Sequence, residues 1–371
     1  MKTGRMFYAL AAVVSILFSN CTPMKTEKNS LNLLVGTYTL GESQGIYRIS
    51  FDPETGRLSD SVLVAPTENP SYLALSADGK SVYSVNENEE GLVTAFRWNE
   101  SGKLDQTSQL STNGAYPCYI DAANGWVSVA NYGSGNVVFY QTNDAGDLLD
   151  NPVIRQHEGK GPDSARQEGP HAHYAAFDNQ AKWNYAVDLG IDAIKAYGIN
   201  ENGEIGEGIT ALQLDGGEGP RHLAFIPEKK LAFVVNELSS TVVSMAWDTD
   251  NGTFVPIQRI STLPAGFEGT SYCADVHASA DGKFLYVSNR GHDSIAIFSI
   301  AENGNLSLVG TESVRGKWPR NFTLSPDNQF LLVANQHTHN VTVFAIDPAT
   351  GLLSYTGNEI SIDSPVCLKF Y

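Results

Sequence analysis

A degenerate repeat runs through most of this chain and constrains its fold more than any other feature. The segment Asn69–Glu87, which reads NPSYLALSADGKSVYSVNE, returns in altered form at residues 116–131, 169–188, 219–237, 271–290 and 318–336. Its first half returns once more at residues 364–371. A period of about 46 to 53 residues is typical of a propeller or a solenoid, in which each repeat is one structural unit.

Each copy has the pattern of four short β-strands. Two runs flank a turn that contains Gly or Asp, a third alternating run follows, as at 341–346, and a weaker fourth run ends the copy, as at 353–356. Short runs with a period of two between turn signals indicate strands. Four-stranded units of this length are typical of propeller blades.

The two ends of the chain each lack part of a repeat. Residues 364–371 supply a first strand with nothing after it, whereas 33–39 and 45–51 supply later strands with no first strand before them. Six full copies and this composite unit predict an all-β, seven-bladed propeller with four-stranded blades. We expect the C-terminal strand to pair with the N-terminal strands, because that pairing closes the ring and leaves only short sheet edges.

Composition favours one acidic domain without a nucleic-acid partner. The chain has 371 residues, of which 42% are hydrophobic, and a formal charge of −17. One propeller over residues 31–371 uses nearly all of it. Nucleic-acid binding requires a basic surface, so that class of partner is excluded. We expect a monomer or a weak dimer whose acidic surface keeps it soluble.

The N-terminus has the pattern of an export signal. Lys2 and Arg5 precede the apolar run Met6–Phe18, which is too short to span a membrane, and Cys21 follows. The pattern is similar to a bacterial lipoprotein signal, which implies that residues 1–20 are removed, that Cys21 is lipidated and that residues 21–30 form a polar tether. We expect an exported protein that touches the membrane of the cell envelope only through this anchor; the alternative is a cytoplasmic protein.

The remaining cysteines give no sign of disulfides or metal binding. Cys118, Cys273 and Cys367 lie near the starts of first strands in blades that are not neighbours, and such a sparse, odd-numbered set favours small buried side chains. The chain also lacks Cys-x-x-Cys, His-Glu-x-x-His, phosphate-loop and Gly-x-Ser-x-Gly patterns. We expect neither a metal nor a cofactor.

Superposing the copies separates residues that every blade needs from residues that occur once. The second strand ends in Asn or Asp in every full copy, at residues 86, 131, 188, 236, 289 and 335. A short polar side chain can bond its own backbone there and hold the turn, so we interpret this set as structural. Residue types that occur in one copy only are the candidates for function.

Two variable positions carry most of these candidates. The start of the first strand holds Ser71, Cys118, His173, Arg221, Ala274, Arg320 or Val366, and the position after the terminal Asn or Asp holds Glu87, Tyr132, Leu189, Glu237, Arg290 or Gln336. The two strands pair antiparallel and the first lines the channel, so both positions should open on one mouth. The charged members should meet there as an internal ion-pair set or as an anion site.

A long polar connection, residues 156–173, leads into the copy that begins at residue 169 and opens on the same mouth. It brings Arg166, Gln167 and His171 beside His173. Long loops over a rigid scaffold are often functional. We expect these three loop residues to help bind a substrate.

At these residues the chain resembles the seven-bladed propeller lactonases, which include bacterial propeller-type 6-phosphogluconolactonases and fungal carboxymuconate cycloisomerase. The likeness covers Leu31–Tyr371 and is carried by RQEGPHAH at 166–173, GPRHLAF at 219–225, VNE at 235–237 and SNR at 288–290. The family's proposed metal-free set implies that the catalytic residues here are His173, Arg221, Arg290 and Glu237. The resemblance implies opening or closing of a carbohydrate-acid or dicarboxylic-acid lactone.

Lactone hydrolysis needs a base that deprotonates water, positive charge that stabilises the oxyanion, and groups that bind the acid group of the substrate. His173 suits the base, and Glu237 could orient it or take its place. Arg221 and Arg290 suit the oxyanion and the acid group, and Arg320 would extend the binding site with the loop residues. The leading hypothesis is a metal-independent lactonase for an acidic sugar lactone, similar to 6-phosphogluconolactonase.

Two other functions stay open at the level of sequence. A non-catalytic propeller could bind a glycan, a peptide or a partner protein through the same face. A calcium-dependent lactonase would need oxygen ligands at the channel, where the sequence instead places arginines. Export favours the binding protein, because 6-phosphogluconolactone is a cytosolic intermediate, whereas the single His, Arg and Glu set favours the enzyme.

Overall fold

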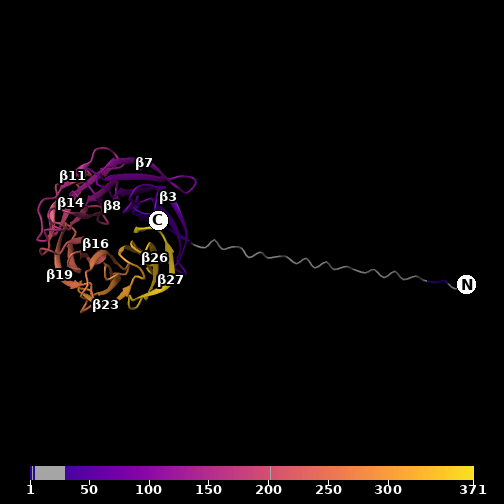
Figure 1. The fold of residues 1–371 in the computed structure, drawn as a ribbon. Coiled ribbons are helices and arrows are strands. Elements are labelled where there is room, and N and C mark those ends of the chain that lie inside the picture. The colour runs from indigo at the N-terminus through magenta and orange to yellow at the C-terminus, as the bar shows by residue number, and fades with distance from the viewer. Residues whose placement is uncertain (2, 5–29, 201) are drawn as a thin grey trace.

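Seven antiparallel four-stranded sheets form a closed ring, which confirms the all-β, seven-bladed propeller (Figure 1). The computed structural model describes Met1, residues 3–4, 30–200 and 202–371. Cys21 and nearly all of the expected signal segment and tether lie outside the described residues. In the part of the chain that is described, no helix is long and apolar enough to cross a membrane.

The first three full blades hold strands β4 to β15. Blade 1 comprises β4 (Leu73–Leu75), β5 (Ser81–Asn86), β6 (Leu92–Trp98) and β7 (Leu104–Ser111). Blade 2 comprises β8 (Pro117–Ala123), β9 (Trp126–Asn131), β10 (Asn136–Gln141) and β11 (Val153–Gln156). Blade 3 comprises β12 (Ala172–Phe177), β13 (Trp183–Asp188), β14 (Ala193–Gly198) and β15 (Ile209–Gln213).

The next three blades follow the same order. Blade 4 comprises β16 (Pro220–Ile226), the short 3₁₀ helix η1 (Pro227–Lys229), β17 (Leu231–Asn236), β18 (Thr241–Asp248) and β19 (Thr253–Ser261). Blade 5 comprises β20 (Tyr272–Ala278), β21 (Phe284–Arg290), β22 (Ser294–Ile300) and β23 (Leu306–Ser313). Blade 6 comprises β24 (Pro319–Leu324), β25 (Phe330–Asn335), β26 (Asn340–Ile346) and β27 (Leu353–Ser361).

Blade 7 joins the two ends of the chain, as the split repeat predicts. It comprises β28 (Pro365–Phe370), β1 (Leu31–Thr37), β2 (Gly45–Asp52) and β3 (Arg57–Pro66). β28 pairs antiparallel with β1, with Leu33 opposite Phe370 and Gly36 opposite Cys367. In Figure 1 the C-terminus, marked C, lies beside the dark purple strands of this blade, near the label β3.

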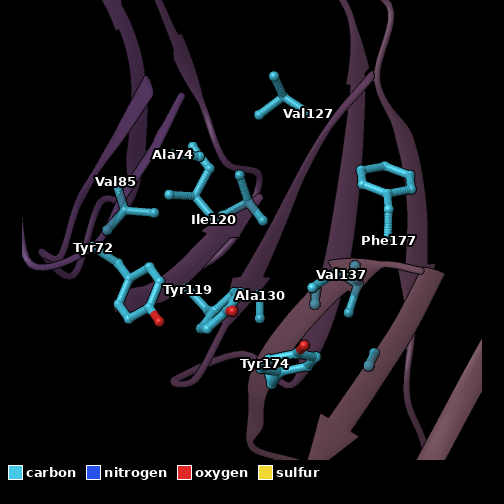
Figure 2. Packing of buried hydrophobic residues seen from close by; sticks show 14 of the residues in the cluster. Tyr72, Ala74, Val85, Tyr119, Ile120, Val127, Ala130, Val137, Tyr174 and Phe177 are labelled. Atoms are coloured by element: carbon cyan, nitrogen blue, oxygen red, sulfur yellow. The ribbon is translucent and has the colours of Figure 1, made fainter. Parts of the chain in front are cut away.

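The first strand of each blade lines the central channel. These seven strands, β4, β8, β12, β16, β20, β24 and β28, each contact the first strands of both neighbouring blades. Tyr72, directly before β4, stacks on Tyr119 of β8 with ring centroids 4.2 Å apart, and Tyr174 of β12 lies tilted against Tyr119 at 4.4 Å. Figure 2 shows the three rings in a row. All three are buried and each follows a mouth position directly in sequence, so the mouth has an aromatic floor.

The Asn or Asp that ends each second strand is structural, but its partners differ from those we expected. Asn131 and Asn289 donate through Nδ2 to the carbonyl oxygens of Thr112 and Thr262, which lie in the connection entering the blade. Asp188 does bond its own turn, through the backbone amides of residues 190 and 191. These side chains tie successive blades together, because the connection that they hold comes from the preceding blade.

Candidate active site

A β-bulge interrupts the first strand at the mouth and gives the variable position its direction. In blade 4 the ladder skips Arg221 between Pro220 and His222. It skips His173 in blade 3 and Arg320 in blade 6 in the same way. An extra residue in one strand re-aims its side chain, and bulges are common beside active sites. One shared backbone irregularity thus presents different side chains to the same mouth.

The residue that follows each second strand faces this mouth as well. The amide of Glu237 donates to the carbonyl oxygen of Gly219 at 2.6 Å, and Glu87 makes the same bond in blade 1 at 3.0 Å. Tyr38 makes the equivalent bond to Ser364 in blade 7, at 3.1 Å. Tyr38 therefore belongs to the mouth, although sequence comparison missed it because its copy of the repeat is divided between the two ends of the chain.

Glu237 is the centre of a buried ion-pair cluster. Its Oε1 lies 2.6 Å from Nη2 of Arg166. Its Oε2 lies 2.7 Å from Nη2 of Arg290 and 3.2 Å from Nε of Arg221. Glu237, Arg221 and Arg290 are buried, and Arg166 is partly exposed. The structure therefore joins three of the predicted catalytic residues and one predicted binding residue in a single unit.

The arginines fix the charge of Glu237. Burial alone would raise its pKa, but Arg290, Arg221 and Arg166 outweigh burial and lower the pKa to about 2. Burial, with the nearby charges of Arg290 and Arg320, lowers the pKa of Arg221 to about 10. Both carboxylate oxygens of Glu237 are paired with guanidinium groups, and its pKa is low. Glu237 therefore holds these guanidinium groups in place and is poorly suited to act as a base.

Several buried polar atoms of the mouth have no hydrogen-bond partner among the described residues. They are Oγ of Ser71, Nδ1 of His173, Nε of Arg221, Nε of Arg290 and Oε1 of Gln336. Nε of Arg221 lies within ion-pair distance of Glu237, but its N–H is not aligned for a hydrogen bond. Buried polar groups are normally satisfied, so this concentration of exceptions indicates a site for a polar ligand.

His173 contributes a neutral ring to the mouth. Burial is the largest cause that lowers its pKa well below the usual 6.5, and Arg221 is the next. The ring packs edge-on against Tyr132, with centroids 5.6 Å apart. A neutral imidazole with an unsatisfied nitrogen can accept a proton from water. Since positive neighbours lower the pKa of His173, an anion bound among them would raise it.

A second buried pair, His222 and Asp275, orients Arg221. Nδ1 of His222 donates to Oδ1 of Asp275 at 2.8 Å, so Nε2 can accept from Nη1 of Arg221 at 3.2 Å. Burial and Arg221 lower the pKa of His222 to about 3, which keeps the ring neutral. Asp275 is held in turn by Asn321 and His277. We did not identify this pair from the sequence, where nothing places Asp275 beside His222.

A smaller cluster forms where blades 6, 7 and 1 meet the mouth. Oη of Tyr38 donates to Oε2 of Glu87 at 2.8 Å, and Nη2 of Arg320 lies 3.8 Å from Oε1 of Glu87. Burial lowers the pKa of Arg320, but Tyr38 and Glu87 outweigh burial and raise it overall. With Glu237 and its three arginines, the mouth thus holds four arginines and two glutamates. This excess of positive charge favours an anion.

The long connection between β11 and β12 delivers Arg166 to the mouth. His157 anchors its start, with Nδ1 2.6 Å from Oδ2 of Asp188 and Nε2 2.7 Å from Oη of Tyr197. All three anchoring residues are buried. The loop is therefore fixed at its base, and Arg166 reaches from its far part to Glu237.

The other two loop candidates make contacts within the protein. Gln167 is fully buried, and its amide donates to the carbonyl oxygen of Leu189 at 2.8 Å and accepts from the amide of Asp163 at 3.2 Å. The ring of His171 stacks on Tyr132 at 4.5 Å, and its Nδ1 lies 2.8 Å from the carbonyl oxygen of Tyr132. The expected contact between Gln167 and a substrate thus finds no support, because its side chain holds the loop. His171 supports Tyr132 at the edge of the mouth.

Cys118 shares the mouth but is unsuited to act as a nucleophile, because burial raises its pKa and the thiolate is the reactive form. Cys118, Cys273 and Cys367 are all buried free thiols, as we expected. Within residues 30–200 and 202–371, no group of three or more His, Cys, Asp or Glu side chains is arranged to hold a metal ion.

Comparison with known proteins assigns this chain to one family. The family described as "Lactonase, 7-bladed beta-propeller" matches residues 32–370. The chain belongs to this family, and it is a lactonase, a carboxylic-ester hydrolase. The resemblance found in the sequence is thereby confirmed.

Three relatives show how close the similarity is. The chain is 38% identical to the 6-phosphogluconolactonase of Bacillus subtilis (strain 168) over 341 residues, which is 91% of this chain and 97% of the relative. It is 31% identical to the 6-phosphogluconolactonase of Formosa agariphila, over 91% of this chain and 99% of the relative. The structure of the periplasmic gluconolactonase of Pseudomonas aeruginosa matches with a TM-score of 0.84 and 33% identity, covering 92% of this chain and 99% of that chain.

Proposed function

We propose that the mouth is the active site of a metal-independent lactonase that hydrolyses the lactone of an acidic sugar. The observation that carries the proposal is the set of buried, unsatisfied atoms in one mouth, above all Nδ1 of His173 and Nε of Arg221 and Arg290. Lactone hydrolysis requires a proton acceptor for water and donors for the oxyanion, which these atoms supply. The names of the relatives, 6-phosphogluconolactonase and periplasmic gluconolactonase, support a lactone derived from a sugar acid.

The steps of the reaction divide among these groups. Neutral His173 takes a proton from a water molecule as the water oxygen attacks the lactone carbonyl carbon. The carbonyl oxygen becomes an oxyanion, which Arg221 and Arg290 stabilise. The tetrahedral intermediate then breaks the ring C–O bond, and His173 returns the proton to the leaving alkoxide, which gives the open hydroxy acid. Glu237 stays ionised and holds the guanidinium groups in position.

The positive excess of the mouth supports an acidic substituent on the substrate. The side chains of Arg166 and Arg320 are 33% and 18% exposed, whereas that of Arg221 is 2% exposed. The two more accessible guanidinium groups can bind a phosphate or carboxylate in bidentate fashion, while the buried pair acts on the carbonyl. A bound acid group would also raise the pKa of His173 and make it a better base.

Turnover on a panel of lactones tests the proposal. The purified protein is assayed with 6-phosphogluconolactone, glucono-δ-lactone and uronic-acid lactones, with and without EDTA, against spontaneous hydrolysis. We expect acidic lactones to be hydrolysed faster than neutral ones, and EDTA to have no effect. No turnover of any lactone would contradict the proposal, and so would activity that EDTA removes and calcium restores.

We also propose that the protein is exported and anchored through Cys21, and that it acts as a monomer or a weak dimer. The basic residues Lys2 and Arg5 before the apolar run Met6–Phe18 support export. The Pseudomonas aeruginosa relative is named as periplasmic, which also supports it. Cell fractionation of wild type and Cys21→Ser tests the anchor: the variant should leave the membrane fraction, and a variant that stays there contradicts lipidation at this residue.

A further inference from the structure

A third equivalent position, two residues before the variable position at the start of each first strand, forms the rim of the mouth. Its carbonyl oxygen accepts from the residue after the second strand, as that of Trp318 does from Gln336 at 3.1 Å. Across the seven blades this rim position holds Asn69, Tyr116, His171, Gly219, Tyr272, Trp318 and Ser364. A large aromatic side chain occupies this position in blades 2, 5 and 6, so the repeat does not require one in every blade.

Tyr272 and Trp318 form an aromatic wall beside the ion-pair cluster of Glu237. Their ring centroids lie 6.4 Å apart, and both rings are partly exposed. The guanidinium carbon of Arg290 lies 5.4 Å from the Trp318 centroid, and that of Arg166 lies 5.8 Å from the Tyr272 centroid. Each of these arginines also binds Glu237, so the wall is joined to the cluster through two cations.

One residue of this wall has a left-handed backbone conformation. Trp318 has φ = 64°, in the left-handed region, which a bulky side chain adopts at an energetic cost. Asn69, Tyr116, Gly219 and Ser364 also have positive φ at the rim, so the left-handed backbone belongs to this position, and Trp318 and Tyr116 are the bulky residues that adopt it. A strained aromatic residue beside a candidate active site is a reason to look for a ligand contact there.

A groove of about 390 Å³ lies beside Tyr272 of this wall. Arg166, which also binds Glu237, lines it together with Tyr272, and the other lining residues include Ser239, Thr270, Leu238 and Leu263. The volume is within the range of about 300–1,000 Å³ that is usual for small-molecule sites. Its charged lining groups, Arg166 and Asp163, have opposite signs, so the groove does not favour a second anion.

We propose that this groove is a second subsite, which binds a neutral sugar ring attached to the lactone. The inference rests on the proposed function and names the substrate class: lactones of oligosaccharide aldonic acids. The partly exposed face of Tyr272 and the leucines can pack against the C–H groups of a pyranose ring. Hydroxyl and backbone groups along the groove can bond its hydroxyls. The lactone ring then lies at His173 and the next ring in the groove.

Cellobiono-δ-lactone and glucono-δ-lactone test the subsite, because they differ by one neutral glucose ring. We expect kcat/KM to be about tenfold higher for the disaccharide lactone, which is the scale of one well-packed ring. Thr270 is exposed, so Thr270→Trp fills the groove without disturbing the core, and it should abolish this preference. Tyr272→Ala should abolish it as well, and Tyr272→Phe should retain it. Tyr116→Ala, at the same rim position in blade 2 and outside the groove, is the matched control and should leave the ratio unchanged.

The outcomes separate this inference from the proposed function. Equal kcat/KM for the two lactones in the wild type overturns the subsite, and so does a preference that survives both Thr270→Trp and Tyr272→Ala. If no lactone is turned over, the proposed function fails, and calorimetry with cellobionate and gluconate then tests the groove alone. Cellobionate should bind about tenfold more tightly than gluconate, and Thr270→Trp should remove the difference; equal affinities overturn the subsite.

Discussion

Two glutamates occupy the same structural position in blades 1 and 4, yet their surroundings give them different roles. The side chain of Glu237 is 6% exposed and contacts three guanidinium groups within 3.2 Å. Glu87 is 13% exposed, bonds Tyr38 and has the guanidinium group of Arg320 3.8 Å away. The repeat places both carboxylates at the mouth, and the neighbouring side chains determine how deeply each is buried and how many guanidinium groups it contacts. Function in this propeller therefore comes from departures from the repeat.

Exchanging each carboxylate for an amide should show this difference most strongly. Glu237→Gln should lower the free energy of unfolding by about 3–5 kcal/mol, because three guanidinium groups lose their counter-charge in a buried site. Glu87→Gln, the matched control, should lower it by about 1 kcal/mol or less. Denaturant unfolding of both variants measures the two values. Equal losses would mean that the two clusters are equivalent.

The arginines of the two clusters should differ in their effect on acidic and neutral lactones. Arg290→Lys should lower kcat about a hundredfold on both kinds of substrate, because a lysine cannot reproduce the fixed donors that stabilise the oxyanion. Arg320→Lys should lower kcat/KM about tenfold for acidic lactones and leave neutral ones nearly unchanged. Steady-state kinetics on 6-phosphogluconolactone and glucono-δ-lactone distinguish the two. If Arg320→Lys affects both lactones alike, the division of roles is wrong.

Replacing His222, which orients Arg221, should have a smaller effect on catalysis, and the effect should be confined to kcat. His222→Phe removes the acceptor for Nη1 of Arg221 and keeps a ring to pack against Tyr119, so kcat should fall about tenfold while KM changes little. His222→Gln retains an acceptor and should recover part of the loss. A lower Tm with unchanged kcat would show that His222 only supports the fold.

The pH dependence of stability should show the smallest effect. His222, with its pKa lowered to about 3, binds a proton in the unfolded chain near pH 6.5 but stays neutral in the folded protein. The unfolded state therefore takes up the proton first, and this residue lowers stability progressively as the pH falls below 6.5. Comparing Tm of wild type and His222→Phe from pH 7 to pH 4 measures the contribution of His222 together with the change that the variant makes in its partner Asp275. The Tm of the variant should fall less steeply; parallel curves would contradict the assignment.

The fold could be predicted from the sequence because the same pattern of strands and turns recurs in each of the seven blades. Alternating runs and turn residues define the blades, and the split copy at the two ends defines the closure between β1 and β28. The positions of Arg221, Glu237 and Arg290 followed from antiparallel pairing, which brings the start of one strand beside the end of the next.

Other parts of the site depend on contacts that a repeat does not encode. Asp275 reaches His222 from the next blade, across a bulge whose direction the sequence does not show. Tyr38 was hidden because its copy is divided between the chain ends. Gln167 occurs once and is polar, which suggested substrate binding, but its side chain turns into the loop. Whether a polar side chain faces a ligand or the backbone depends on local packing.

Replacing His173 by alanine tests the central claim most directly. Its Nδ1 has no hydrogen-bond partner among the described residues, so the variant should still fold, with a Tm lowered by the loss of ring packing against Tyr132 and His222. The account predicts that kcat on the best lactone of the panel falls about a hundredfold to ten-thousandfold, which is the usual contribution of a general base. Because the pKa of His173 is held well below 6.5, the acid limb of the wild-type kcat/KM profile should lie below that pH and should be absent in the variant. Full activity with an unchanged pH profile would contradict the account and place the base elsewhere.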